Sequence, residues 1–130
     1  MGDISKDFSR KEFRCPCGCG FDDIARALVD TVQVIRDAAG VPVIVNSGCR
    51  CKKHNAAVGG VSNSSHLSGL AADIYIKGWN NTKLGDLIKR LYSAGKLPFL
   101  RYCYKISGST KTAVHVDADG LKRRSKIFGF

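Results

Sequence analysis

Two imidazoles and one carboxylate stand out among the residues of this chain that could do chemistry. The sequence has only three histidines, His54, His66 and His115, and Asp73 follows His66 in an apolar stretch. An ionised carboxylate among apolar neighbours is costly unless an Arg, a Lys or a metal ion compensates its charge. His66, Asp73 and His115 are together the ligand set of an open catalytic zinc site, which leaves a fourth position for water. On the residues alone, two unrelated histidines and an Asp73 paired with an Arg stand as the alternative.

Alternating side chains predict the strands that would carry these residues. The strands are expected over 41–47 and 71–76, with a hairpin formed by 99–106 and 112–119. Alternation places Asp73 and Tyr75 on one face of their strand, and it places Ala113, His115 and Asp117 on one face of the last strand. The Gly-, Ser- and Asn-rich loop over 54–70 carries His66, and long ordered loops in compact domains are often functional.

Two amphipathic helices are expected to support the strands. Apolar residues recur at the helical spacing over 24–40 and over 82–95. We expect Asp22 and Asp23 to cap the first helix, and Asn81 or Thr82 to cap the second. The segment after Arg50 also reads as a short helix. Helices and strands in this order predict an α+β fold, with a small antiparallel sheet flanked by helices.

Length and charge limit the function classes. The chain has 130 residues, which suits a single domain over 1–130 with one core. No apolar run is long enough to cross a bilayer, so no membrane insertion is expected. The net charge of +10 implies an anionic partner, such as nucleic acid, anionic lipid or a cell-wall polymer. Part of this charge lies in the basic segment 121–126, where a solvated chain end is the common explanation.

The six cysteines leave three alternatives open. Cys15, Cys17 and Cys19 lie in the run CPCGCG, Cys49 and Cys51 flank Arg50, and Cys103 stands apart. The Cys-x-Cys-x-Cys run with a distant cysteine could hold a second metal, although zinc fingers usually space their cysteines more widely. A disulfide to Cys51 or Cys49 and free thiols are the other two possibilities.

The region around His66 resembles a known signature. The stretch SGCRCKKHNAAVGGVSNSSHLSGLAADI is similar to the core of the zinc D-Ala-D-Ala carboxypeptidases and the related phage endolysin peptidases. That family has a Ser-Gly-aromatic-Arg segment, a His-Asn pair, a Ser-x-His-x-x-Gly-x-Ala-x-Asp motif and a closing His-x-Asp strand. The matching residues are Ser47, Gly48, Arg50, His54, Asn55, Ser64, His66, Gly69, Ala71, Asp73, His115 and Asp117. The resemblance spans roughly residues 8–119 and implies the hedgehog/DD-peptidase fold.

The resemblance also implies residue roles. His66, Asp73 and His115 correspond to the zinc ligands. Arg50 corresponds to the residue that pairs with a substrate carboxylate, which its planar guanidinium can bind through two hydrogen bonds. A structural ion pair with Asp73 is the alternative for Arg50. Ser64 could contact substrate or cap a turn, and a loop-ordering role is expected for His54.

This sequence departs from the family pattern at two places. Cys49 replaces the usual aromatic residue, so it either packs in the core or joins the N-terminal cysteines. Many relatives also place a Glu, Asp or His a few residues before the last ligand, whereas STKTAV precedes His115 here. Asp117 is the best local candidate for the general base, although it could instead orient a ligand histidine. Asp119 is a weaker candidate for the same role.

Together these features predict a zinc metallopeptidase that cleaves an amide bond in bacterial peptidoglycan stem peptides. It would act as a D,D-carboxypeptidase or an endolysin-type endopeptidase, with zinc-activated water attacking the carbonyl and with Asp117 and Arg50 as catalytic residues. We expect a monomer. We also expect no nucleic-acid partner, because few aromatic residues interleave with the basic ones. The N-terminal segment lacks an apolar secretory signal, so we expect synthesis in the cytoplasm and action at the cell wall after phage-type release, or as a virion component. The alternative is a catalytically inactive zinc-binding module of the same fold, which would bind the cell wall or a protein.

Overall fold

The computed structural model describes residues 2–107, 110–120 and 126–130. Its α-helices are α1 (Arg26–Ala39), α2 (Lys52–Ala57) and α3 (Asn81–Ser93), and its two 3-10 helices are η1 (Arg10–Phe13) and η2 (Ser65–Ser68). Its strands are β1 (Ile44–Ser47), β2 (Ala71–Tyr75), β3 (Tyr102–Lys105) and β4 (Val114–Asp117). The expected strands and helices are therefore all present, including the short helix after Arg50. Most of the basic segment 121–126 and part of the turn at 107–109 lie outside the described residues.

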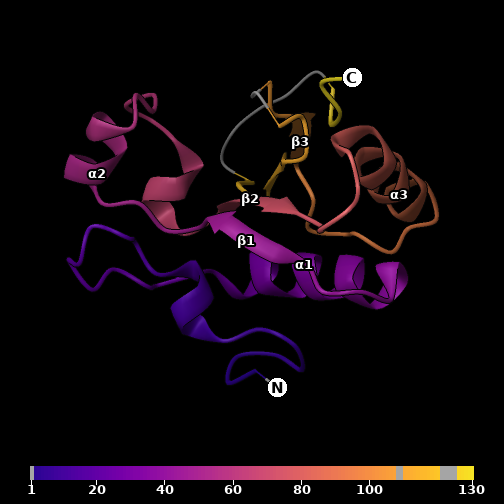
Figure 1. Ribbon diagram of the computed structural model, residues 1–130, viewed down its shortest axis with the longest axis horizontal. Helices are drawn as coiled ribbons and strands as arrows, with labels where there is room; N and C mark the ends of the chain where they lie inside the picture. The colour runs from indigo at the N-terminus through magenta and orange to yellow at the C-terminus, as the bar shows by residue number, and fades with distance from the viewer. Residues whose placement is uncertain (1, 108–109, 121–125) are drawn as a thin grey trace.

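The strands form one four-stranded sheet in the order β1-β2-β4-β3. Each neighbouring pair is antiparallel, and β3 and β4 pair as the expected hairpin. This confirms the predicted α+β fold with a small antiparallel sheet. In Figure 1, α1 lies across one face of the sheet, while α2 and α3 lie at opposite ends of the molecule. Across residues 2–107, 110–120 and 126–130, no helix combines the length and apolar character that crossing a bilayer requires.

The sheet separates an apolar face from a polar one. Ala72, Ile74, Val114 and Val116 belong to the buried core, together with the apolar stripe of α1. Their alternate neighbours on β2 and β4 face the other way, as the period-2 pattern predicts. α3 contacts β3, β4 and α1, so it closes the core at its side of the sheet. The core thus supports one face of the sheet, and the polar residues of the same strands remain available for chemistry.

The helix starts differ from the sequence expectation. Ala25 is the N-cap of α1, and its side chain makes no capping hydrogen bond, so Asp22 and Asp23 do not cap this helix. The backbone N–H of Ala25 instead donates to the carbonyl of Gly69, which satisfies this helix-end group through a tertiary contact. The N-cap of α3 is Asn80, whose side chain accepts a hydrogen bond from the backbone N–H of Lys83. The capping residue thus precedes the predicted pair by one position.

Gly69 is required by its backbone conformation and by its close packing against the start of α1. Its φ of 70° lies in the left-handed region, and a Cβ at this position would lie 2.2 Å from the carbonyl oxygen of Asp23. Gly69 lets the His66 loop pack tightly against the start of α1.

Candidate functional site

A single row of side chains crosses all four strands on the polar face of the sheet. Ser47 pairs with Asp73 between β1 and β2, Asp73 pairs with His115 between β2 and β4, and His115 pairs with Tyr104 between β4 and β3. Directly opposed residues on one face of an antiparallel sheet lie close enough to interact. The register of the sheet therefore brings Asp73 and His115 together, although they are far apart in the sequence.

His66 joins this row from η2. Ser64, the N-cap of η2, accepts a hydrogen bond from the backbone N–H of His66, which confirms the capping role for Ser64. The Nδ1 atom of His66 lies 2.7 Å from the carbonyl oxygen of Gly48. Because a carbonyl only accepts, Nδ1 must carry the proton, and Nε2 of the neutral ring is left with its lone pair. This Nε2 lies 3.3 Å from Oδ1 of Asp73, so the lone pair faces the site.

The three expected ligands converge on one small volume. Besides the His66 contact, Nδ1 of His115 lies 2.9 Å from the same Oδ1 atom of Asp73. One donor atom from each of His66, Asp73 and His115 lies within 4.8 Å of the others, and all three residues are buried. Ligands held about 2.0–2.1 Å from a tetrahedral zinc ion are about 3.3 Å from one another. The donor types and separations thus fit a zinc ion with three protein ligands.

His115 is held between two carboxylates. Its Nδ1 faces Asp73, while its Nε2 lies 3.3 Å from Oδ2 of Asp117. The other oxygen of Asp117 accepts a hydrogen bond from the backbone N–H of Asp119 at 2.8 Å. The arrangement resembles the carboxylate–histidine–metal chains in which a second carboxylate fixes the orientation of a ligand ring.

The charges of these groups depend on one another. Burial by itself opposes ionisation of Asp73, yet the hydrogen bond from His115 and the neighbouring imidazole of His66 hold its pKa well below the usual value. Burial likewise opposes the charged form of His115, but hydrogen bonds to Asp117 and Asp73 raise its pKa. Burial also opposes ionisation of Asp117, but hydrogen bonds from His115 and from the Asp119 backbone together lower its pKa. Both carboxylates are therefore ionised at neutral pH.

Arg50 lies beside the ligand cluster. Its guanidinium donates from Nη2 to Oδ2 of Asp73 at 3.3 Å, from Nε to Ser47 at 3.1 Å and from Nη1 to Asn55 at 3.3 Å. Asp73 thus presents one oxygen to the two histidines and the other to Arg50. The ion pair with Asp73 that was the alternative for Arg50 is present in the structure. The guanidinium has more N–H donors than these three contacts use, so it can also bind another group.

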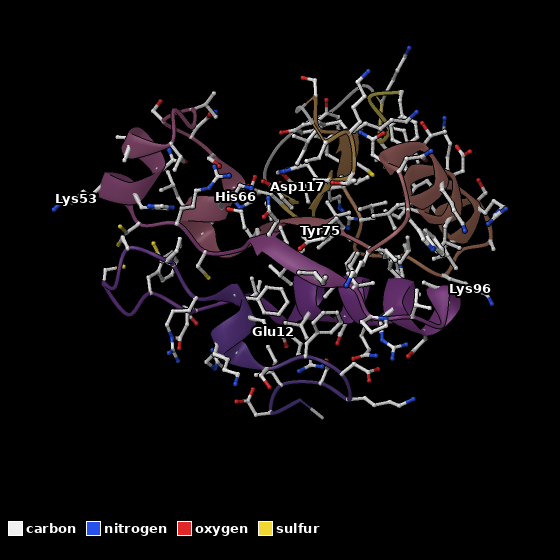
Figure 2. All side chains as sticks on the ribbon, viewed as in Figure 1. Glu12, Lys53, His66, Tyr75, Lys96 and Asp117 are labelled. Atoms are coloured by element: carbon white, nitrogen blue, oxygen red, sulfur yellow. The ribbon has the colours of Figure 1, made fainter. Side chains whose placement is uncertain are left out.

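A cleft of about 350 Å³ opens over these residues. Figure 2 shows the side chains of His66 and Asp117 near each other on the polar face of the sheet, and both line this cleft. The full lining is Arg50, Gly59, Gly60, Val61, Ser64, Ser65, His66, Asp73, Tyr102, Tyr104, His115 and Asp117. The cleft therefore gathers six of the candidate site residues expected from the sequence: Arg50, Ser64, His66, Asp73, His115 and Asp117.

Two tyrosines of the site were not predicted. Tyr104 stacks on the ring of His115, with ring centroids 4.6 Å apart and an interplanar angle of 19°, and Tyr102 lies next to Tyr104. Alternation along the predicted hairpin could have found them, because Tyr102 pairs with Asp117 and Tyr104 with His115. These rings form the wall of the cleft on the β3 side.

The remaining candidates lie outside the ligand cluster. Asp119 is buried and accepts a hydrogen bond from Ser65 at 3.1 Å, but it does not line the cleft. His54 lies in α2, where its backbone N–H donates to the sulfur of Cys51. The neighbouring Asn55 orders this region, since its side chain bonds both Arg50 and the carbonyl of Val61. No metal-ligand group of the described residues contains His54.

The cysteines divide into a cluster and a core pair. Cys15, Cys17, Cys19 and Cys51 place their sulfur atoms within 4.8 Å of one another. Cys49 and Cys103 are instead fully buried in the apolar core, so Cys49 does not join the N-terminal cysteines. All six are free thiols in the structure, so neither alternative disulfide, to Cys51 or to Cys49, is formed.

Comparison with known proteins assigns this architecture to a family. The family model described as peptidase M15 matches residues 6–117, a span that includes every cleft residue. A search of curated proteins gives no match. Peptidases of the M15 family are zinc-dependent, which agrees with the donor set formed by His66, Asp73 and His115. The chain therefore belongs to the peptidase M15 family, the family of the zinc D-Ala-D-Ala carboxypeptidases.

Proposed function

We propose that this protein hydrolyses an amide bond in the stem peptides of bacterial peptidoglycan, as a D,D-carboxypeptidase or an endopeptidase. One observation carries the proposal: a metal-ligand set and an arginine with spare donors line the same cleft. A metal centre beside an anion-binding group suits a peptide substrate that has a carboxylate near its scissile bond. The net charge of +10 suits attraction to an anionic cell wall.

His66, Asp73 and His115 would hold the zinc ion. When bound, zinc supplies Lewis-acid polarisation of the scissile carbonyl and lowers the pKa of water toward about 7. His66 would bind through Nε2, because Gly48 already occupies Nδ1. His115 would bind through Nδ1, because its Nε2 is directed at Asp117. Each histidine thus has an acceptor on its second nitrogen, which fixes the ring and makes the ligating nitrogen more basic.

Arg50 would bind and orient the substrate carboxylate. Its side chain is fixed by three partners on three different segments, namely Ser47, Asn55 and Asp73. A guanidinium that is already ordered loses little conformational entropy when it binds a carboxylate. The remaining N–H donors could form a charge-assisted contact, which is about twice as strong as a neutral hydrogen bond.

Asp117 would act mainly by positioning His115. Both of its oxygens are engaged, one by His115 and the other by the backbone of Asp119. A general base must be within hydrogen-bond reach of the proton that it takes, and apo geometry does not exclude a later approach. We therefore assign the orienting role to Asp117 and keep proton transfer as the competing assignment, which an Asp117→Asn substitution separates.

A catalytically inactive zinc-binding module is the second candidate function. The shortage of candidates for a general base favours this function. Among the described residues that line the cleft, the carboxylates are Asp73 and Asp117 alone, and each already has partners. Such a module would bind cell-wall peptides through Arg50 without cleaving them. The two functions differ only in turnover, so a direct cleavage assay separates them.

The test is mass spectrometry of purified peptidoglycan digested with the zinc-loaded protein. We expect new muropeptides that disappear with a chelator, return with added zinc and are absent for a His66→Gln variant. Loss of a terminal D-Ala would indicate a carboxypeptidase, whereas separated stems or cross-bridges would indicate an endopeptidase. Asp86→Asn, which changes an exposed carboxylate on α3, is the matched control and should cleave normally. Unchanged muropeptides together with retained binding to insoluble peptidoglycan would support the inactive module instead.

A further inference from the structure

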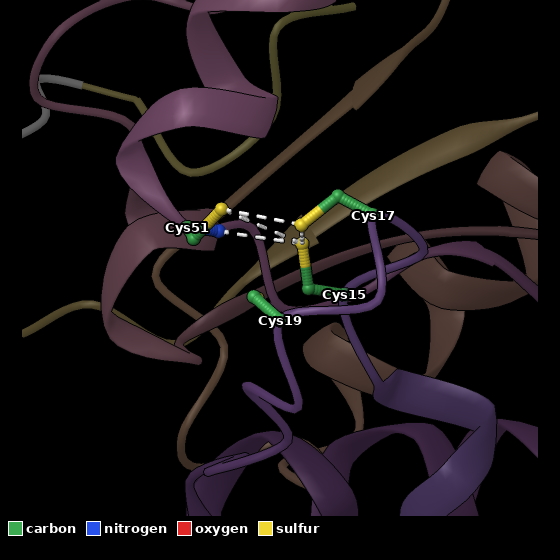
Figure 3. A group of neighbouring side chains, drawn as sticks. All are labelled: Cys15, Cys17, Cys19 and Cys51. Carbon is green, nitrogen blue, oxygen red and sulfur yellow. Dashed lines mark hydrogen bonds between the residues drawn. The ribbon is translucent and has the colours of Figure 1, made fainter.

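The four clustered cysteines lie outside the cleft, and the proposed hydrolysis does not use them. Cys15, Cys17 and Cys19 come from the loop after η1, and Cys51 is the N-cap of α2 (Figure 3). We propose that these four side chains form a second, structural zinc site. This site would fasten the N-terminal loop to the segment that carries Arg50.

The separations of the sulfur atoms fit a tetrahedral thiolate site. Sγ of Cys15 lies 3.5 Å from that of Cys17 and 3.9 Å from that of Cys51, and Cys17 and Cys51 are 3.5 Å apart. Cys19 completes a group whose four sulfur atoms all lie within 4.8 Å of one another. Thiolates bound about 2.3 Å from a tetrahedral zinc ion are about 3.8 Å apart, which lies between the observed values.

The local backbone explains how such short spacing can surround one ion. The loop is closed by a 2.8 Å hydrogen bond from the backbone N–H of Cys15 to the carbonyl of Phe21. Within it, Gly18 and Gly20 both have φ of 87°, a region that residues with a Cβ rarely adopt. A turn at residues 16–17 and a bend at residues 18–19 curve the chain around these cysteines. The Cys-x-Cys-x-Cys run can therefore direct three thiols to one point, which an extended chain could not do.

Packing does not account for this convergence. Free cysteines are normally among the most buried residues, and they behave as small apolar side chains. Cys15 is buried, but Cys17 and Cys19 are exposed, and Cys51 is only partly buried. Backbone N–H groups also point at the sulfur atoms: that of Cys51 at Cys15, 3.5 Å away, and that of His54 at Cys51, 3.4 Å away. Such hydrogen bonds stabilise negatively charged sulfur, the form that binds metal.

Zinc is the ion that this donor set favours. Four soft thiolates in a tetrahedral arrangement select zinc or iron over magnesium and calcium, which prefer oxygen ligands. Four protein ligands also leave no coordination position for water or substrate, so the site is closed and structural. It thus differs in kind from the three-ligand site of the cleft.

The site would stabilise the segment that builds the cleft. Gly48 holds the ring of His66 through its carbonyl, Arg50 pairs with Asp73, and Cys51 belongs to the cluster. The same segment is tied to the N-terminal chain by a 2.7 Å hydrogen bond from the backbone N–H of Cys49 to the carbonyl of Phe13. A zinc ion beside this contact would therefore support the catalytic cleft from outside it.

The experiment counts zinc in the full-length protein, purified under reducing conditions, by elemental mass spectrometry. We expect two zinc ions per chain in the wild type and one in Cys19→Ser, a substitution that leaves the core unchanged because the Cys19 side chain is exposed. Asp73→Ala should also retain one ion, and the double variant none. Cys49→Ala is the matched control: it removes a cysteine two positions from Cys51 but outside the cluster, and it should keep both ions.

A second measurement identifies the ligands without relying on a variant. Cobalt-loaded protein should show the intense near-ultraviolet sulfur-to-cobalt absorption of a thiolate site, and Cys19→Ser should lose it while Asp73→Ala keeps it. One zinc per chain that only Asp73→Ala removes would overturn the proposal. So would a chain lighter by two hydrogens under non-reducing conditions, which shows a disulfide, or the visible absorption of thiolate-bound iron. Because none of these measurements uses cleavage, their failure is distinct from a failure of the peptidase assignment.

Discussion

The side chain of Asp117 offers the sharpest test of how the cleft works. Replacing it with Asn keeps its size and removes its charge, so the buried space stays filled while His115 loses a carboxylate partner. If Asp117 orients His115, the zinc affinity of the cleft should fall, because partners of this kind typically contribute about 10–100-fold to affinity. The Nε2–Oδ2 separation of 3.3 Å exceeds the roughly 2.7–2.9 Å of a strong charge-assisted bond. We therefore expect a loss of zinc affinity at the lower end of this range, about tenfold, which corresponds to about 1.4 kcal/mol of binding free energy.

The measurement is a competition titration of zinc-free protein against a chromophoric chelator, with muropeptide turnover measured in parallel at saturating zinc. In the titration, the zinc-binding phase that Asp73→Ala abolishes belongs to the cleft. Asp86→Asn, which removes the charge of one exposed carboxylate, is the control. A general base would behave differently, since its loss lowers kcat by about 10²–10⁴-fold and leaves metal affinity alone. Unchanged zinc affinity in Asp117→Asn would refute the orienting role and assign proton transfer to this carboxylate.

Three further perturbations test other parts of the structure. Arg50→Lys keeps the charge but loses the planar guanidinium. The KM for a substrate with a free carboxylate should therefore rise at least tenfold, while zinc content stays constant. An unchanged KM would exclude carboxylate recognition by Arg50. Gly69→Ala should lower the free energy of unfolding by about 1–2 kcal/mol because of the left-handed backbone, and by more because the new Cβ would meet a carbonyl oxygen. Gly59→Ala, with φ of 75° but open space around its Cβ, should show only the backbone loss of about 1–2 kcal/mol. Chemical denaturation of both variants measures the difference. In chelated protein, the raised pKa of His115 contributes stability that is present below about pH 6.5 and lost as pH rises through the folded-state pKa. The lowered pKa of Asp73 contributes stability that is present above about pH 3.9 and lost as pH falls, so denaturation midpoints should peak between these limits; a His115→Gln variant that kept the alkaline loss would contradict this reasoning.

The strands and their faces could be predicted because alternation directly reflects which face is buried. The same pattern assigned His115 and Asp117 to a polar face, and Val114 and Val116 to the core. The ligand set followed from residue types and from the family signature. What one strand cannot show is its register against the next, and so the direct pairing of Asp73 with His115 needed coordinates.

Other features depended on contacts between distant segments. The backbone N–H at the start of α1 is satisfied by the carbonyl of Gly69, a distant residue, and for this reason the local sequence predicted the wrong capping residues. Tyr102 and Tyr104 were missed because aromatic residues on a strand are more often packing residues than walls of a cleft. The cysteine run matched no usual finger spacing, and its convergence depends on two glycines with positive φ and on Cys51, 32 residues after Cys19.

The irregularity in β1 has a consequence for how this site can change. Ile44 and Val45 pair in step with Tyr75 and Ile74, but Ser47 then pairs with Asp73, so Asn46 is an extra residue that the partner strand does not match. If Asn46 instead paired regularly with Asp73, Ser47 would point to the opposite side of the sheet. The serine that holds Arg50 is thus brought to the polar side by an insertion and not by its own chemistry. Deleting Asn46 would restore regular pairing with the serine still opposite Asp73, whereas a regular strand that kept Asn46 would turn the serine away from Arg50.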